Sequence, residues 1–237
     1  MDKLDKPKHC VSCGSAGLGN FCSECGVSYT VKRITLHSLI HEGFHLFTHL
    51  DKGFGYTLKR LLLQPGAMQR DYIDGDRARN QKPFSMFFLC ATLTALFRYW
   101  TFNLIVHLYG IDNSIEANFL HKYMVFMQMA LLPVYTLLCY LIFRKSRFNF
   151  AEVGVMLLYT TSFFFLSSIF ISALKLIWPN LDTAYVEAPI LLVYNAITFV
   201  NFYRDVSKWK VIVKSLIIFT LIFMLIQTVE DLLIRNL

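Results

Sequence analysis

Residues 152–178 read EVGVMLLYTTSFFFLSSIFISALKLIW, and no residue from Val153 to Leu174 carries a charge. An apolar stretch of this length is typical of a transmembrane helix, because about 20 residues rising 1.5 Å each cross the hydrocarbon core of a bilayer. Four further stretches share this character: residues 84–106, 120–143, 185–203 and 210–233. The sequence therefore predicts an all-α membrane protein with a bundle of five transmembrane helices over residues 83–237.

The composition of the chain supports this fold class. Of the 237 residues, 55% are apolar and 16% are charged, whereas about 25% of the residues of a soluble domain are charged. The formal net charge is +7, and many of the basic residues lie in short loops between the apolar stretches. This distribution favours membrane orientation and lipid contact, and it disfavours nucleic acid as a partner.

The loop charges also predict the orientation of the chain. The loop after the second span contains Arg144, Lys145 and Arg147, and the loop after the fourth contains Arg204, Lys208 and Lys210. The other two loops carry acidic residues beside their lysines. Because loops rich in Lys and Arg face the cytoplasm, five spans place the N-terminus in the cytoplasm and the C-terminus outside. The first 30 residues lack the apolar core of a cleavable signal peptide, so we expect the first span to direct insertion.

Four cysteines near the N-terminus form two matching patterns. Residues 10–14 read CVSCG and residues 22–26 read CSECG. Each pattern is typical of a tight turn that directs two thiolates to one point, and two such turns suit a tetrahedral Zn²⁺ ion in a closed, structural site. Iron is the less favoured ion, and two disulfides are disfavoured in a reducing cytoplasm. We predict a zinc-ribbon segment over residues 1–30, with four ligands: Cys10, Cys13, Cys22 and Cys25.

Amphipathic helices are expected between this segment and the first span. Residues 35–50 place leucine, isoleucine and phenylalanine on one arc of a helix and histidines on the other, and residues 54–63 repeat the design. Helices of this kind lie in the membrane interface with the apolar face buried. The sequence therefore divides residues 31–82 from the rest as interfacial helices and a basic linker.

The polar arc of the first helix holds a second candidate metal site. His41, Glu42 and His45 match H-E-x-x-H, in which two histidines share a zinc ion and the glutamate is the general base of a peptidase. His49 continues the spacing as a third ligand. The match is short, so the favoured interpretation is a solvated helix face. Metal binding or proton sensing by the histidines and a metallopeptidase are the alternatives.

Further candidate sites rest on single basic residues. Those before the first span are expected to contact anionic lipid headgroups, each contributing about 1 kcal/mol, although positive-inside topology alone also explains them. They are Lys59, Arg60, Arg70, Arg77, Arg79 and Lys82. Inside the first span, Arg98 is expected to extend to the outer interface or to pair with Glu187.

Several short sequences over residues 10–90 belong together. After the two cysteine patterns, they are LDKGF at 50–54, LLQPG at 62–66, RDYIDGDR at 70–77 and KPFS at 82–85. Together they resemble a bacterial family of unknown function that is known mainly from Bacteroidetes. The resemblance implies an N-terminal zinc-ribbon-like segment joined to a multi-span membrane region, and it supplies no assigned activity. It implies a multi-pass protein of the bacterial cytoplasmic (inner) membrane.

Together these features favour a non-enzymatic adaptor or scaffold. Its zinc ribbon would dock a cytoplasmic protein partner, or lipid, at the membrane face. A membrane-associated zinc metallopeptidase is the first alternative, and a small transporter or channel is the second.

Overall fold

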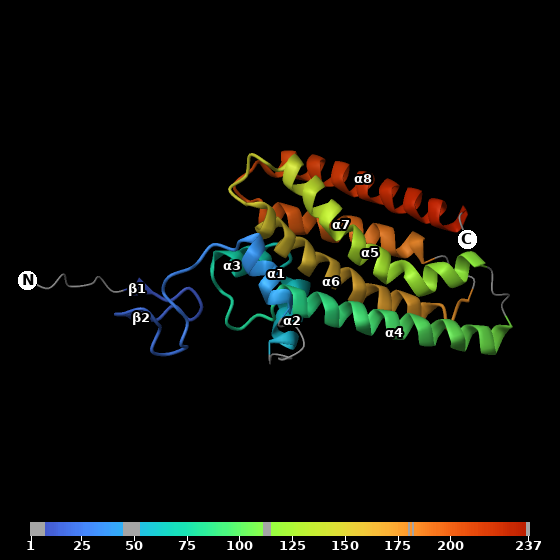
Figure 1. Ribbon diagram of the computed structural model, residues 1–237, viewed down its shortest axis with the longest axis horizontal. Helices are drawn as coiled ribbons and strands as arrows, with labels where there is room; N and C mark the ends of the chain where they lie inside the picture. The colour runs from blue at the N-terminus through green and yellow to red at the C-terminus, as the bar shows by residue number, and fades with distance from the viewer. Residues whose placement is uncertain (1–7, 45–52, 111–114, 180, 182, 236–237) are drawn as a thin grey trace, which may run out of the picture.

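Five long helices form a bundle in the computed structural model (Figure 1). The structure describes residues 8–44, 53–110, 115–179, 181 and 183–235. The five helices are α4 (Pro83–Tyr109), α5 (Ile115–Ile142), α6 (Phe150–Leu174), α7 (Ala184–Phe202) and α8 (Lys208–Arg235). Each contains a stretch that is long and apolar enough to cross a membrane. The predicted fold class is therefore confirmed, and the chain is an all-helical, multi-pass membrane protein.

The helix ends follow from local sequence. Pro83 occupies the first turn of α4, where its fixed φ suits a helix start, and Gly110 ends this helix with φ +60°. At the start of α6, the side chain of Asn149 accepts a hydrogen bond from the backbone N–H of Glu152, and the Glu152 carboxylate accepts one from the N–H of Asn149. This reciprocal capping fixes the position at which the central helix begins.

Helix α6 lies at the centre of the bundle, in contact with α4, α5 and α7. Most of its residues are buried, whereas most of α8 is exposed. The closest packing is against α4, where the Thr94 hydroxyl donates a hydrogen bond to the Phe165 carbonyl at 2.8 Å. The exposed apolar side chains of the outer helices form the surface that a lipid bilayer would cover.

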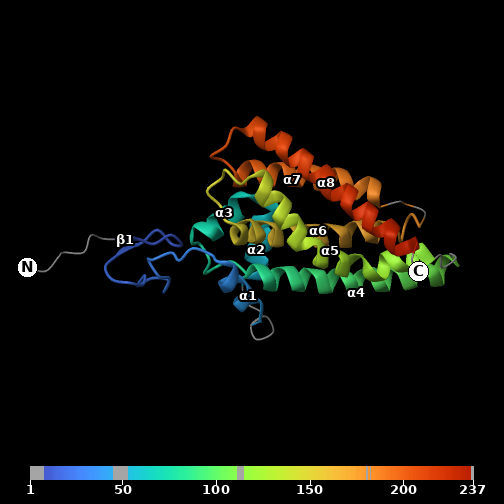
Figure 2. The same ribbon diagram turned by 45° about the horizontal axis from the view of Figure 1, so that its top comes forward.

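A small N-terminal unit, residues 8–30, projects beyond one end of the bundle (Figure 2), and we call it the head. Its β1 strand (Lys8–His9) pairs antiparallel with β2 (Ala16–Gly17). Residues 31–35, the tether, connect the head to α1 (Leu36–Phe44). Leu39 of α1 is buried and lies beside Gly154 of α6.

Two more short helices, α2 (Phe54–Leu63) and α3 (Ala67–Asp74), cover the same end of the bundle and form its cap (Figure 1). Gly66 joins them with φ +79°, and a Cβ atom there would lie 2.1 Å from the carbonyl oxygen of Thr198 on α7. Asn201 donates a hydrogen bond to the Pro65 carbonyl at 2.8 Å. Helix α3, whose bounds the sequence analysis did not give, packs against α6 and α7.

Candidate metal centre and the charged end of the bundle

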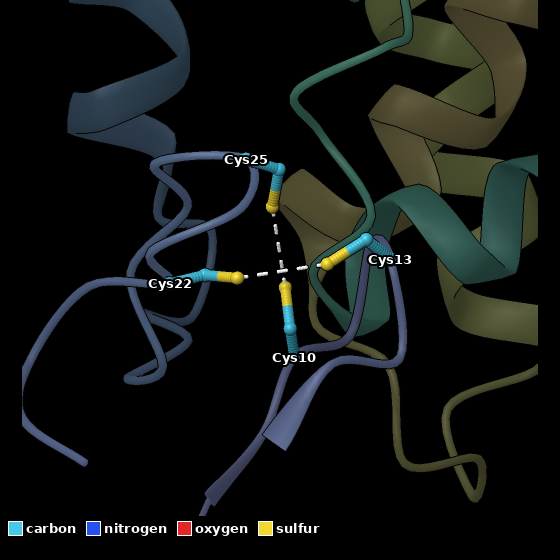
Figure 3. A group of neighbouring side chains, drawn as sticks. All are labelled: Cys10, Cys13, Cys22 and Cys25. Carbon is cyan, nitrogen blue, oxygen red and sulfur yellow. Dashed lines mark hydrogen bonds between the residues drawn. The ribbon is translucent and has the colours of Figure 1, made fainter. Parts of the chain in front are cut away.

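The four cysteines of the head point toward one another from two loops (Figure 3). Their sulfur atoms all lie within 4.8 Å of one another, and two pairs, Cys10 with Cys25 and Cys13 with Cys22, are 3.5 Å apart. A tetrahedral ion with four bonds of about 2.3 Å needs sulfur atoms about 3.8 Å apart. The observed separations fit that requirement and exceed a disulfide bond of about 2.05 Å. All four residues are free thiols, so together they could hold a metal ion.

Matching turns bring the sulfur atoms together. The N–H of Gly14 donates to the carbonyl of Cys10, and the N–H of Gly26 donates to the carbonyl of Cys22, both at 2.9 Å. The two glycines have φ +77° and +72°, backbone angles that residues with a Cβ atom rarely adopt. The glycine after each second cysteine is therefore what allows the backbone to turn around the cluster.

Ser15 is a residue of the candidate metal centre that the sequence analysis missed. Its hydroxyl lies 2.9 Å from the sulfur atoms of both Cys13 and Cys22. The hydrogen bond from Ser15 is the largest cause that lowers the pKa of Cys22 to about 5, and it also lowers the pKa of Cys13. Because the thiolate is the form that binds a metal, Ser15 prepares two of the four ligands. The only sequence signal was a serine directly after the first C-x-x-C-G pattern.

The cluster contains sulfur ligands alone. Across the described part of the chain, no histidine or carboxylate joins these cysteines, and no other group of three or more His, Cys, Asp or Glu side chains could hold a metal. Four protein ligands complete a tetrahedral shell and leave no position for a reacting water. The arrangement is therefore chemically suited to a structural ion.

The second predicted metal site falls mostly outside the described residues. His41 lies on α1 with an exposed side chain. The side chain of Glu42, and the whole of His45 and His49, are outside the described part of the structure. The peptidase motif therefore stays a prediction.

Ion pairs crowd the end of the bundle that carries the cap. Arg60 of α2 contacts Asp71 at 2.6 Å and Asp76 at 2.9 Å. Arg70 of α3 is 8% exposed and contacts Asp205 of the α7–α8 loop at 2.8 Å. Five arginines meet five carboxylates in this ion-pair layer, so its charges cancel: Arg33, Arg60, Arg70, Arg147 and Arg204 with Asp71, Asp74, Asp76, Glu152 and Asp205.

The six basic residues predicted to contact lipid therefore divide into two sets. Arg60 and Arg70 belong to the ion-pair layer, and Arg77 donates to the carbonyls of Lys32, Tyr72 and Ile73. These three guanidinium groups bind protein atoms. The other set is exposed: Lys59, Arg79 and Lys82.

Arg98 is buried inside the bundle, as is Glu187 of α7. The side chain of Arg98 thus lies among the helices and does not extend along their lipid-facing surface. Charged side chains placed in the interior of a membrane bundle are costly and usually have a defined role in packing or function.

The fold and the cysteine cluster together define a multi-pass membrane protein with a candidate metal-binding head. A family described as "Protein of unknown function (DUF3667)" matches residues 51–95. No curated protein matches the chain, and no solved structure does. The matched segment includes α2, α3 and the first part of α4. The similarity therefore covers the cap and the start of the first span, and it does not reach the four cysteines of the head.

Proposed function

We propose that the protein is a non-enzymatic adaptor of the bacterial cytoplasmic membrane that holds a structural zinc ion in its head and docks a cytoplasmic protein partner. The observation that carries this proposal is the closed cluster of four sulfur atoms at one end of a membrane bundle. A closed site maintains a shape, whereas a catalytic zinc site keeps an open position. Zinc is favoured over iron because it has no redox chemistry and is commonly bound by paired C-x-x-C turns.

The distribution of charge supports a cytoplasmic head. The head, the α5–α6 loop and the α7–α8 loop all lie at one end of the bundle (Figure 1). Beyond the ion-pair layer, this end exposes further basic residues, including Arg144, Lys145, Lys208 and Lys210. Basic loops favour the cytoplasmic side. The end of α8 lies at the opposite end of the bundle and would face outside.

The surface of the head supports a protein partner. Leu18 is 68% exposed and Phe21 is 67% exposed, although the head is very small. Large apolar side chains displayed by a rigid scaffold are typical of the central contacts of a protein interface. The partner would then bury these two side chains beside the metal centre.

The cap supports contact with membrane lipids. Leu62 and Leu63 of α2 are exposed, and the exposed Lys59, Arg79 and Lys82 belong to the same segment. Apolar side chains entering the interface beside cations that attract anionic headgroups are typical of an interfacial helix. The cap would thus lie in the membrane interface, while the head extends into the cytoplasm.

Two measurements test the adaptor. Elemental analysis of detergent-purified protein should find one zinc per chain, which is lost when Cys10, Cys13, Cys22 and Cys25 are changed to Ser. A cross-linking pull-down from the native membrane should then recover a protein partner with the wild-type chain, and Leu18→Ser with Phe21→Ser should lose it while retaining zinc. Ser23→Ala, at an exposed head position, is the matched control. Absence of zinc, or a partner retained by the double variant, would contradict the proposal.

A further inference from the structure

A pocket of about 360 Å³ lies where the tether meets the bundle. Its walls are the tether, the C-terminal end of α3, and the α5–α6 loop with the first turn of α6. The tether is held there by backbone contacts: Arg77 donates to the Lys32 carbonyl and Asn149 donates to the Ile34 carbonyl, both at 2.9 Å. The pocket is therefore formed by segments that are far apart in sequence and fixed in place.

Both carboxylates in the pocket wall are already neutralised. Glu152 is buried and accepts hydrogen bonds from Nε and Nη2 of Arg33, at 2.9 and 3.1 Å, and from the N–H of Asn149. The two oxygens of Asp74 lie 2.6 and 2.7 Å from Nη2 of Arg147. A cation entering the pocket would have to compete with these arginines for both carboxylates.

The same two arginines have N–H donors that the described residues leave unused. A guanidinium group has five N–H donors, and Nη1 of Arg33 and Nη1 of Arg147 make no hydrogen bond with any residue that the structure describes. The Arg33 side chain is 61% exposed and that of Arg147 is 49% exposed. The Arg147 guanidinium lies 4.8 Å from the ring centroid of Phe148, which restrains its plane. The unused N–H donors of the pocket thus belong to two cationic side chains.

The other residues of the pocket wall favour an anionic group that is carried on a carbon skeleton. Val31, Ile73 and Phe148 are apolar. Guanidinium groups match the oxygens of a phosphate group well, and two of them can share one phosphate. The apolar residues would contact the carbon atoms that carry it.

We propose that this pocket binds a phosphate ester, with Arg33 and Arg147 as its donors. A phospholipid headgroup and a soluble phosphate ester present the same group, and the position of the pocket at the basic end of the bundle is compatible with both sources. Because Arg33 belongs to the tether and Arg147 to the bundle, one bound phosphate would join the two. This site requires neither the zinc ion nor the protein partner proposed above.

Hydrogen exchange of the tether amides in the full-length protein tests this site. The soluble probe is glycerol 3-phosphate, added to detergent-purified protein against chloride at equal ionic strength. The lipid probe is a phosphatidylcholine nanodisc with or without phosphatidic acid. Arg33→Lys and Arg147→Lys keep each charge but replace the three donor nitrogens of the guanidinium group with one ammonium nitrogen. Arg204→Lys is the matched control, because Arg204 belongs to the ion-pair layer and does not line the pocket.

A phosphate ester should slow exchange of residues 31–34 in the wild-type protein. Each pocket variant should weaken the apparent affinity roughly tenfold, and Arg204→Lys should leave it unchanged. Protection by glycerol 3-phosphate would identify a soluble ester, and protection by phosphatidic acid alone would identify a lipid. The proposal is overturned if neither probe protects the wild-type tether, or if Arg204→Lys weakens binding as much as the pocket variants. The wild-type protein alone shows whether a phosphate ester protects the tether, even if a variant fails to fold. Zinc content is measured on the same samples, so failure of the phosphate site can be told apart from failure of the proposed adaptor.

Discussion

The head and the bundle are maintained by different interactions. In the described part of the head, the buried apolar residues are Cys10 and Cys22 alone, whereas the bundle has one continuous core that extends through α4, α5, α6, α7 and α8. A unit as small as residues 8–30 cannot bury enough apolar surface to offset its loss of chain entropy. The comparison indicates that the head would depend on a bound metal ion for order, while the bundle depends on packing.

Removal of the metal should have the largest effect, and it should affect the head and not the bundle. A strong chelator should unfold the head outright, as is usual for small zinc-dependent units, and should leave the helices folded. Limited proteolysis should then cut within residues 8–30, while circular dichroism and the thermal transition of the bundle stay unchanged. The variant with all four head cysteines changed to Ser should behave in the same way without chelator. Cys90→Ser is the control, since Cys90 is buried in α4; a protease-resistant head after chelation would contradict the expectation.

Gly66→Ala should damage the bundle and spare the head. The new Cβ would meet the Thr198 carbonyl oxygen at 2.1 Å in a backbone conformation with φ +79°. We expect a loss of about 3 kcal/mol in the free energy of unfolding, measured by denaturation in mixed micelles, with zinc content unchanged. Gly55→Ala is the matched control, because nothing lies within 4 Å of a Cβ at Gly55. Equal stability of the two variants would show that the cap does not pack on α7 as described.

Glu152→Gln should loosen the connection between the two regions. The substitution removes the charge that pairs with Arg33, while the glutamine amide oxygen can still accept the hydrogen bond that caps α6. Because the Arg33 side chain is largely exposed, the ion pair is partly screened, so we expect roughly tenfold faster hydrogen exchange at residues 31–35. The zinc content and the bundle transition should be unaffected. Asp231→Asn, at an exposed position of α8, is the control; unchanged tether exchange in Glu152→Gln would refute the role of this pair.

Ser15→Ala should have the smallest effect, confined to the metal centre. Removal of the hydroxyl raises the pKa of Cys22 from about 5, so protons compete with the metal at higher pH. Wild-type protein should retain zinc at pH 7 and release it as the pH falls toward 5, and Ser15→Ala should release it at a higher pH. At pH 7 its zinc affinity should fall about tenfold. A chromogenic chelator measures the release, with Ser23→Ala as the control, and coincident release curves would exclude the role of Ser15.

The parts of the structure that depend on local pattern could be predicted from the sequence. Apolar stretches indicated the five spans, and the C-x-x-C-G spacing indicated that four sulfur atoms would converge. The ion pair between Arg70 and Asp205 could not be predicted, because these residues are 135 positions apart and meet only when α3 packs on α7. For the same reason the sequence did not reveal Gly66 as a site of close approach to α7. Ser15 was missed because its role depends on the folded position of Cys22.

Ionic strength should distinguish two populations of basic residues at one end of the bundle. The arginines of the cap, Arg60 and Arg70, are largely shielded from solvent by their carboxylate partners, so dissolved ions screen them weakly. Lys59, Arg79 and Lys82 are exposed, and at 0.1 M salt the attraction to headgroups that we propose for them would be screened beyond about 10 Å. Concentrated salt should therefore weaken binding of the cap to an anionic bilayer without changing the structure of the cap. The shielded pairs of Arg60 and Arg70 should keep the shape of the cap independent of the salt concentration, while the exposed basic residues around them respond to it.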